Sequence, residues 1–173
     1  MILRSDLGCE SSVSTVVDFF KMAHIFGLWD GTNIGVRKEV LRRAMTEENK
    51  AVVRRLVHEV INKGRLEVAD ELFTPEGVAG AREAFTNFRS AFPDWREDIV
   101  DLIAEGDKVV GHFTCTGTLQ GEFMGMPPTG KRMEIDEVYI LRIEGGRIVE
   151  YWGIEDNLTR LTQLGLMPES GER

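Results

Sequence analysis

Three acidic residues of one predicted strand could do acid/base chemistry. Glu134, Asp136 and Glu137 lie close together in the segment 132–143. Side chains alternate between the two faces of a strand, so Glu134 and Asp136 share one face, while Glu137 shares the other with Tyr139 and apolar residues. Charged residues of a strand usually face water. Glu137, on the more apolar side, is therefore the pocket candidate of the three, and carboxylates and tyrosines can transfer protons there.

Asp156 is the second acidic candidate. It follows the segment 147–154 and shares its strand parity with Trp152 and Ile154. If no β-bulge intervenes, Asp156 follows these two side chains into the pocket. Desolvation beside Trp and Ile side chains would raise the pKa of this carboxylate, which suits a general base. The alternative is that Asp156 caps a helix beginning at Asn157. Spacing alone favours neither.

Other polar and aromatic residues could contact a substrate or serve the structure alone. His112 lies within a predicted strand, where it either lines the pocket or faces solvent. Tyr139 could donate a hydrogen bond to a substrate oxygen or fill the core. Cys115 is predicted to be a small buried hydrophobe. The predicted substrate contacts are Tyr139, Trp152, His112 and Phe123.

Helices come first along the chain, and strands follow them. Apolar residues recur at three- and four-residue spacing before residue 92, and the period changes to two after Trp95. This pattern predicts helices over residues 48–61, 66–72, 80–91 and 157–164, and strands over residues 98–103, 108–118, 132–143 and 147–154. The order indicates an α+β fold, with N-terminal helices packed on one face of a curved antiparallel sheet. Such a sheet and its helices can enclose a pocket.

The beginning of the chain differs from the rest. Met45 is a natural start, because Thr46 is a suitable helix N-cap and acidic residues follow it. We interpret residues 1–44 as an N-terminal extension that need not belong to the native protein. The domain is then predicted over residues 45–168, and residues 169–173 form a tail.

Composition excludes several classes of function. The chain has 173 residues, a formal net charge of -8 and only short basic groups, which argues against nucleic-acid binding. The apolar segment 16–29 carries charges and is too short to span a bilayer. Cys9 and Cys115 are far apart, and the three histidines show no metal-ligand spacing. We expect a cytoplasmic protein without metal, cofactor, membrane or nucleic-acid partner.

The segment 117–131, GTLQGEFMGMPPTGK, follows an unusual backbone path because it is rich in Gly and contains two consecutive prolines. Together with Ala91-Phe92-Pro93-Asp94-Trp95, it resembles the SnoaL-like polyketide cyclase or ester cyclase family. Further segments carry the same resemblance in the expected order: Asn62-Lys63-Gly64 and residues 101–107, 146–153 and 161–165. The resemblance covers Met45 to about Met167.

This resemblance implies a nuclear-transport-factor-like α+β cone that is often dimeric through its sheet. In the characterised cyclases an acidic pocket residue is thought to act as general acid/base, so that an intramolecular aldol reaction closes a ring without metal or cofactor. The resemblance therefore implies a hydrophobic small molecule with a carbonyl group as substrate, and a homodimer. Asp156 is the best positional match to the acidic residue, with Glu137 or Tyr139 assisting.

Two departures from the family pattern leave other functions open. Relatives usually carry a longer stretch containing a His where residues 74–80 connect two helices directly here. They also often have His at the position of Leu119. The alternatives are a non-catalytic protein that binds an apolar small molecule, and an isomerase or epoxide hydrolase on the same scaffold.

Overall fold

The computed structural model describes residues 34–167. Residues 1–33 of the predicted N-terminal extension and the whole predicted tail, residues 169–173, lie outside the described residues. The first helix of the described residues, α2 (Ile34–Arg55), includes the boundary between two units, residues 1–48 and 49–173. Thr46 lies inside this helix, and its hydroxyl donates to the Arg42 carbonyl oxygen at 2.7 Å. The prediction of Thr46 as N-cap is therefore wrong.

The other described elements lie in the second unit, and the helices there confirm the predicted ones with shifted ends. α2 continues into a π-helical turn, η1 (Leu56–Ile61), after which the Asn62 N–H bonds to the Val57 carbonyl oxygen at 2.8 Å. The helices that follow are η2 (Leu66–Val68), α3 (Ala69–Leu72), α4 (Val78–Ala91) and α5 (Asn157–Leu164). No helix in the described part of the chain is long and apolar enough to cross a membrane.

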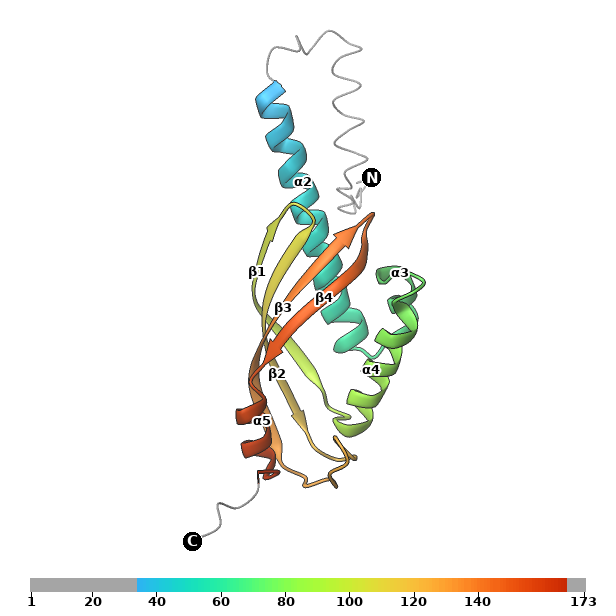
Figure 1. Ribbon diagram of the computed structural model, residues 1–173, viewed down its shortest axis with the longest axis vertical. Coiled ribbons are helices and arrows are strands. Elements are labelled where there is room, and N and C mark those ends of the chain that lie inside the picture. The colour runs from blue at the N-terminus through green and yellow to red at the C-terminus, as the bar shows by residue number, and fades with distance from the viewer. Residues whose placement is uncertain (1–33, 168–173) are drawn as a thin grey trace, which may run out of the picture. The chain divides into compact units, whose positions relative to one another are not determined.

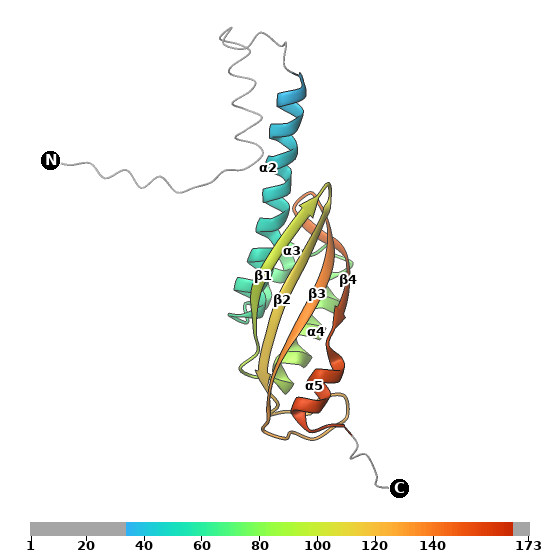
Figure 2. The ribbon, with the colours of Figure 1, turned by 90° about the vertical axis from the view of Figure 1, so that its left-hand side faces the viewer.

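Four antiparallel strands form one sheet in the order of the chain. They are β1 (Arg96–Glu105), β2 (Lys108–Thr118), β3 (Arg132–Glu144) and β4 (Arg147–Glu155). In Figures 1 and 2 the sheet curves, and α3 and α4 lie on one of its faces. The core lies between that inner face and the helices, with Val53, Phe92, Val109 and Ile148 almost completely buried. The predicted α+β architecture is confirmed.

A β-bulge in β4 changes which side chains of this strand point to the inner face of the sheet. Ile143 of β3 pairs with Ile148, whereas the preceding Arg142 pairs with Glu150, so Val149 is an extra residue without a partner. Because each such residue reverses the alternation, the positions after Val149 face the opposite way from those expected of a regular strand. β1 contains a similar shift between Ile99 and Asp101.

The loop between β2 and β3 returns to the end of α4. Asp94 accepts hydrogen bonds from the backbone N–H and the hydroxyl of Thr118, both at 2.7 Å, and so fixes the end of β2. Gly121 lies so close to α4 that a Cβ atom there would be 2.2 Å from the Ser90 carbonyl oxygen. The glycine-rich loop and the segment around Asp94 are thus parts of one contact, which explains why both mark the fold.

Candidate functional site

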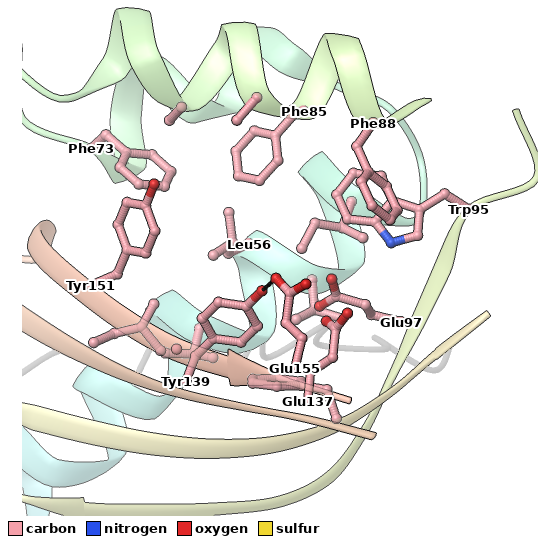
Figure 3. A pocket seen from close by; sticks show the side chains of 18 residues that line it. Leu56, Phe73, Phe85, Phe88, Trp95, Glu97, Glu137, Tyr139, Tyr151 and Glu155 are labelled. Carbon is pink, nitrogen blue, oxygen red and sulfur yellow. Dashed lines mark hydrogen bonds between the residues drawn. The ribbon is translucent and has the colours of Figure 1, made fainter. Parts of the chain in front are cut away.

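A cavity of about 350 Å³ lies between the inner face of the sheet and the helices. This volume is within the range of small-molecule sites, roughly 300–1,000 Å³. Its wall is mostly apolar and aromatic and includes Leu56, Phe85 and Phe88. Figure 3 shows Phe73 and Tyr151 at one end of the cavity. Carboxylate groups gather at the other.

Three glutamates from three strands form this polar end. Glu97 lies on β1, Glu137 on β3 and Glu155 at the end of β4, and all three line the cavity. Glu137 and Glu155 are register partners, so their side chains stand next to each other on the inner face. Glu97 and Glu137 are buried, with 6% and 3% of their surface exposed. Such a cluster needs a counter-charge or bound protons.

Arg160 of α5 supplies the counter-charge from behind the glutamates. Its guanidinium donates to Glu137 Oε1 at 2.7 Å and to Glu155 Oε2 at 2.5 Å, and it is itself buried. The rings of Phe88 and Phe123 lie 5.6 and 5.9 Å from the guanidinium carbon, within cation–π range. The local cause of this placement is α5, which packs against β3.

α5 is held in place at both ends. The Asp156 carboxylate accepts the Thr159 N–H at 3.0 Å and caps the helix. Farther along, the side-chain amide of Gln163 accepts the Glu134 N–H at 2.7 Å and donates to the Glu134 carbonyl oxygen at 3.1 Å. It thus pairs with the backbone of β3 in the way that a residue of a neighbouring strand does. These contacts orient the helix so that Arg160 faces the glutamates.

The surroundings of Glu137 raise its pKa to about 7. Burial is the largest cause, and the negative charge of Glu155 acts in the same direction, whereas Arg160 lowers the pKa. Near neutral pH the group therefore exists both with and without its proton. A carboxyl group with this property can accept and return a proton, which is what general acid/base catalysis requires.

The orientation of Tyr139 depends on a glycine, Gly153, on the neighbouring strand. Its hydroxyl donates to Glu155, and its ring lies directly against Gly153, its register partner on β4. A Cβ atom at Gly153 would be 2.2 Å from the Tyr139 ring. Gly153 thus makes room for the ring to lie across β4 towards Glu155. Burial raises the pKa of Tyr139, so the hydroxyl keeps its proton as a donor.

Glu97 is fixed through its backbone. The side-chain amide of Asn62 accepts the Glu97 N–H and donates to the Glu97 carbonyl oxygen, both at 2.8 Å. Asn62 follows the widened turn of η1, which also contributes Leu56 to the cavity wall. Burial, followed by the charges of Glu137 and Glu155, raises the pKa of Glu97 well above its ordinary value.

One group of side chains in residues 34–167 has the proximity of metal ligands. Ligand atoms of Glu97, Cys115 and Glu137 lie within 4.8 Å of one another, and all three residues are buried. The donor set fits a metal ion poorly. Burial raises the pKa of the Cys115 thiol, which opposes the thiolate form that binds metals, and Glu137 is already bound to Arg160.

The structure does not bring Asp156 into the cavity, which corrects the prediction from strand parity. Asp156 is exposed, and its hydrogen bonds to Thr159 lower its pKa, the opposite of the raised value expected for a buried base. The reason is the bulge at Val149, which turns Tyr151, Gly153 and Glu155 inward. The helix-cap alternative describes its actual position.

Three predicted substrate contacts also lie elsewhere. The same bulge turns Trp152 to the outer face, where 61% of its surface is exposed. His112 is on that face too, with its Nε2 3.3 Å from Asp136. Phe123 is outside the cavity lining and packs on Phe88, behind the wall. Of the predicted site residues, the structure brings Glu137 and Tyr139 together in the cavity.

Sequence reasoning missed Trp95, Glu97, Glu155 and Arg160. Glu97 could have been found, because it alternates with Trp95 and Ile99 at the start of β1. Glu155 was hidden by the bulge. Arg160 stands among polar residues of a short helix, and no spacing rule marks it as a buried partner.

Comparison with known proteins agrees with this architecture. The family model described as SnoaL-like polyketide cyclase matches residues 39–164, which is more than half of the chain. The chain belongs to this family.

The proteins that resemble this chain include named cyclases. The aklanonic acid methyl ester cyclase DauD of Streptomyces sp. (strain C5) is 31% identical over 111 residues, 64% of this chain and 67% of that protein. The enzyme of the same description from Streptomyces peucetius, DnrD, is 27% identical, covering 78% of this chain and 91% of that protein. The solved structure of TsrD from Streptomyces laurentii is 27% identical to this chain, with a TM-score of 0.66. The match covers 70% of this chain and 97% of that chain.

The two positions at which this family member departs from the expected pattern lie outside the cavity lining. Leu119 is completely buried in the core. In the segment 74–80, a turn connects α3 to α4: the N–H groups of Gly77 and Val78 donate to the Thr74 carbonyl oxygen at 3.0 and 2.9 Å. The cavity wall beyond this turn is formed by small residues, Ala81 and Ala84 of α4.

Proposed function

We propose that this protein closes a ring in a hydrophobic polyketide by an intramolecular aldol reaction, with Glu137 as the base and without a cofactor. The observation that carries the proposal is the position of Glu137: a buried carboxyl group with a pKa of about 7, at the polar end of an otherwise apolar cavity. The names of the relatives suggest the substrate class, the methyl ester of an acid such as aklanonic acid.

The reaction needs one group that accepts a proton and returns it. Glu137 removes a proton from a carbon flanked by carbonyl groups, and the electrons of the broken C–H bond form an enolate. The enolate carbon attacks a ketone of the same molecule, a C–C bond forms, and the ketone oxygen becomes an alkoxide. The alkoxide takes the proton back from Glu137. Substrate and product are isomers, so no other reactant is consumed.

The neighbours of Glu137 position it and hold its charge. Arg160 fixes the carboxylate at 2.7 Å, and Tyr139 and Arg160 together fix Glu155 beside it. Phe85, Phe88 and Leu56 provide the apolar wall that excludes water and receives the ring system. Arg160 does not line the cavity, so its role is in positioning.

The test uses aklanonic acid methyl ester as substrate and chromatographic separation of the cyclised product. We expect Glu137→Gln to lose about 10²-fold or more of kcat, as removal of a general base does. Glu134→Gln is the matched control, because it makes the same change on the same strand at an exposed position. Full turnover by Glu137→Gln would remove this residue from the mechanism. Binding of the ester without turnover by the unaltered protein would favour a non-catalytic binding protein.

We further propose that the protein forms a homodimer through the outer face of its sheet. Ile103, Val110, Ile140 and Trp152 are successive register partners across the four strands and form an apolar row on this face. Ile103 and Trp152 each expose more than half of their surface. A second copy offers the same apolar row, which is what a two-fold interface requires.

The dimer is tested by light scattering after size-exclusion chromatography. Trp152→Glu should shift the mass from dimer to monomer, whereas Met124→Glu, at an exposed loop position, should leave the mass unchanged. A monomeric unaltered protein at micromolar concentration would contradict this proposal and leave the cyclase proposal intact.

A further inference from the structure

Two buried polar groups of the cavity wall lack a strong hydrogen-bond partner. The indole N–H of Trp95 is buried and makes no hydrogen bond to the described residues. It lies near the Cys115 thiol, whose sulfur is a weak acceptor. Buried donors are almost always satisfied in folded proteins, so a weakly satisfied donor on a residue that lines a cavity calls for an explanation.

The side chain of Glu97 is the second of these groups. Its backbone is bound by Asn62, but in residues 34–167 no group forms a hydrogen bond with its carboxyl group. Burial and the charges of Glu137 and Glu155 favour its neutral form. A neutral carboxyl group carries one O–H donor. Glu97 therefore also offers a donor to the cavity.

The two donors lie near the same atom, the Cys115 sulfur. Glu97 has a ligand atom within 4.8 Å of the Cys115 sulfur and of a Glu137 oxygen, and the Trp95 N–H lies beside that same sulfur. In Figure 3 the Trp95 nitrogen is on the ring edge that faces the glutamates. Phe85 and Phe88 hold the Trp95 ring, with centroid distances of 6.1 and 4.6 Å. The Trp95 donor is thus fixed before a ligand enters, and Asn62 fixes the backbone that carries Glu97.

We propose that the Trp95 N–H and the carboxyl O–H of Glu97 form an oxyanion site that binds the enolate oxygen of the substrate. This inference rests on the proposed function. Proton transfer to Glu137 moves one negative charge from the protein to the substrate, so donors aimed at the new charge stabilise the enolate. A carboxylic acid that is kept neutral by its surroundings can serve as such a donor. Arg160, on the far side of Glu137, is not available for this role because it does not line the cavity.

The experiment measures phenolate binding, which needs no turnover. In Glu137→Gln the amide imitates the protonated base, and 4-nitrophenol imitates the enolate because its anion has a distinct absorption band. We expect the bound probe to ionise at lower pH than the free probe. Adding Trp95→Phe should weaken phenolate binding about tenfold, the effect of one hydrogen bond to a charged group. Trp152→Phe is the matched control, because it makes the same change outside the cavity, and light scattering checks that this variant keeps the mass of the unaltered protein.

Variants of Glu97 reveal whether its carboxyl group is neutral or ionised. In the same background, Glu97→Gln should retain phenolate binding within about threefold, because the amide still donates, whereas Glu97→Met should weaken it about tenfold. Stronger phenolate binding by Glu97→Gln would show that Glu97 is ionised and would overturn the proposal. Unchanged phenolate binding after the addition of Trp95→Phe would overturn the proposal as well. So would a failure of the Glu137→Gln variant itself to bind phenolate. Turnover by Glu137→Gln would instead contradict the proposed function, so the two failures are distinguishable.

Discussion

Glu137 and Glu155 are register partners on neighbouring strands, and the guanidinium of Arg160 binds both carboxylates. Two like charges directly opposite each other destabilise a sheet, so this pair depends on the cation behind it. The arrangement keeps two acidic groups together inside an apolar cavity. It also makes the site sensitive to any change in Arg160.

Arg160→Met should destabilise the protein by about 3–5 kcal/mol near pH 8, because removal of one partner leaves buried carboxylates unpaired. The loss should be smaller at pH 5, where Glu137 is protonated. Urea unfolding at both pH values measures this. Arg142→Met is the matched control: Arg142 also bridges two glutamates, Glu144 and Glu150, but these are exposed. Equal losses in the two variants would contradict the role given to Arg160.

Glu137→Gln should change how stability depends on pH. The folded-state pKa of Glu137, about 7, lies above its ordinary value of 4.5. Between these values the folded protein binds more protons than the unfolded chain, so the contribution of Glu137 to stability falls as the pH rises through this window. The variant should therefore gain stability relative to the unaltered protein from pH 4.5 to 7. A difference that is constant across this window would show that the pKa of Glu137 is not raised.

The same pKa predicts the pH dependence of the reaction. The base must be unprotonated in the free enzyme, so kcat/KM should rise with pH and reach half of its plateau near pH 7. A profile with aklanonic acid methyl ester between pH 5 and about 9 measures this. A half-maximum near 4.5 would indicate a solvated carboxylate as base and would exclude Glu137.

Gly153→Ala should disturb Tyr139, because the new methyl group would overlap its ring and push the hydroxyl from Glu155. We expect a cost of about 1–3 kcal/mol from overpacking and a lower kcat. Tyr139→Phe separates the two effects, since it removes the hydroxyl and keeps the ring. Gly80→Ala, at an unobstructed helix position, should instead stabilise the protein slightly. Unchanged kcat in Gly153→Ala would mean that the orientation of Tyr139 does not matter for turnover.

Asp156→Asn should keep both turnover and stability, because Asn is also a good helix N-cap. Asp156→Ala should lower the thermal midpoint, since the hydrogen bond to the Thr159 N–H is lost. Differential scanning fluorimetry and the cyclisation assay measure the two properties. Loss of turnover in Asp156→Asn with an unchanged midpoint would return Asp156 to the mechanism.

The fold could be predicted from the sequence because its signals are local. Alternating apolar residues, turn glycines and Pro93 mark the strands and the end of α4, and the observed elements follow them closely. Glu137 could be assigned to the inner side for the same reason: β3 is regular around it, so its parity with Leu141 holds.

The rest of the site depends on contacts that sequence periodicity does not report. Glu155 and Tyr151 reach the cavity through a bulge, which occurs without a distinctive residue such as Gly or Pro at Val149. Arg160 is buried by the docking of α5 on β3, a tertiary event determined by Gln163 and Asp156 together. The start of α2 was mistaken because Thr46 can bond to a carbonyl oxygen inside a helix as well as cap one.

The bulge at Val149 has a consequence for comparing relatives by alignment. One inserted residue in β4 reverses the orientation of every side chain that follows it in the strand. An alignment whose gap is displaced past Tyr151 would set Asp156 in the column that belongs to Glu155. Deletion of Val149 would similarly exchange the inner and outer faces of the sheet along this strand, bringing Trp152 and Asp156 inward. A single-residue deletion is thus a larger change to this site than most substitutions.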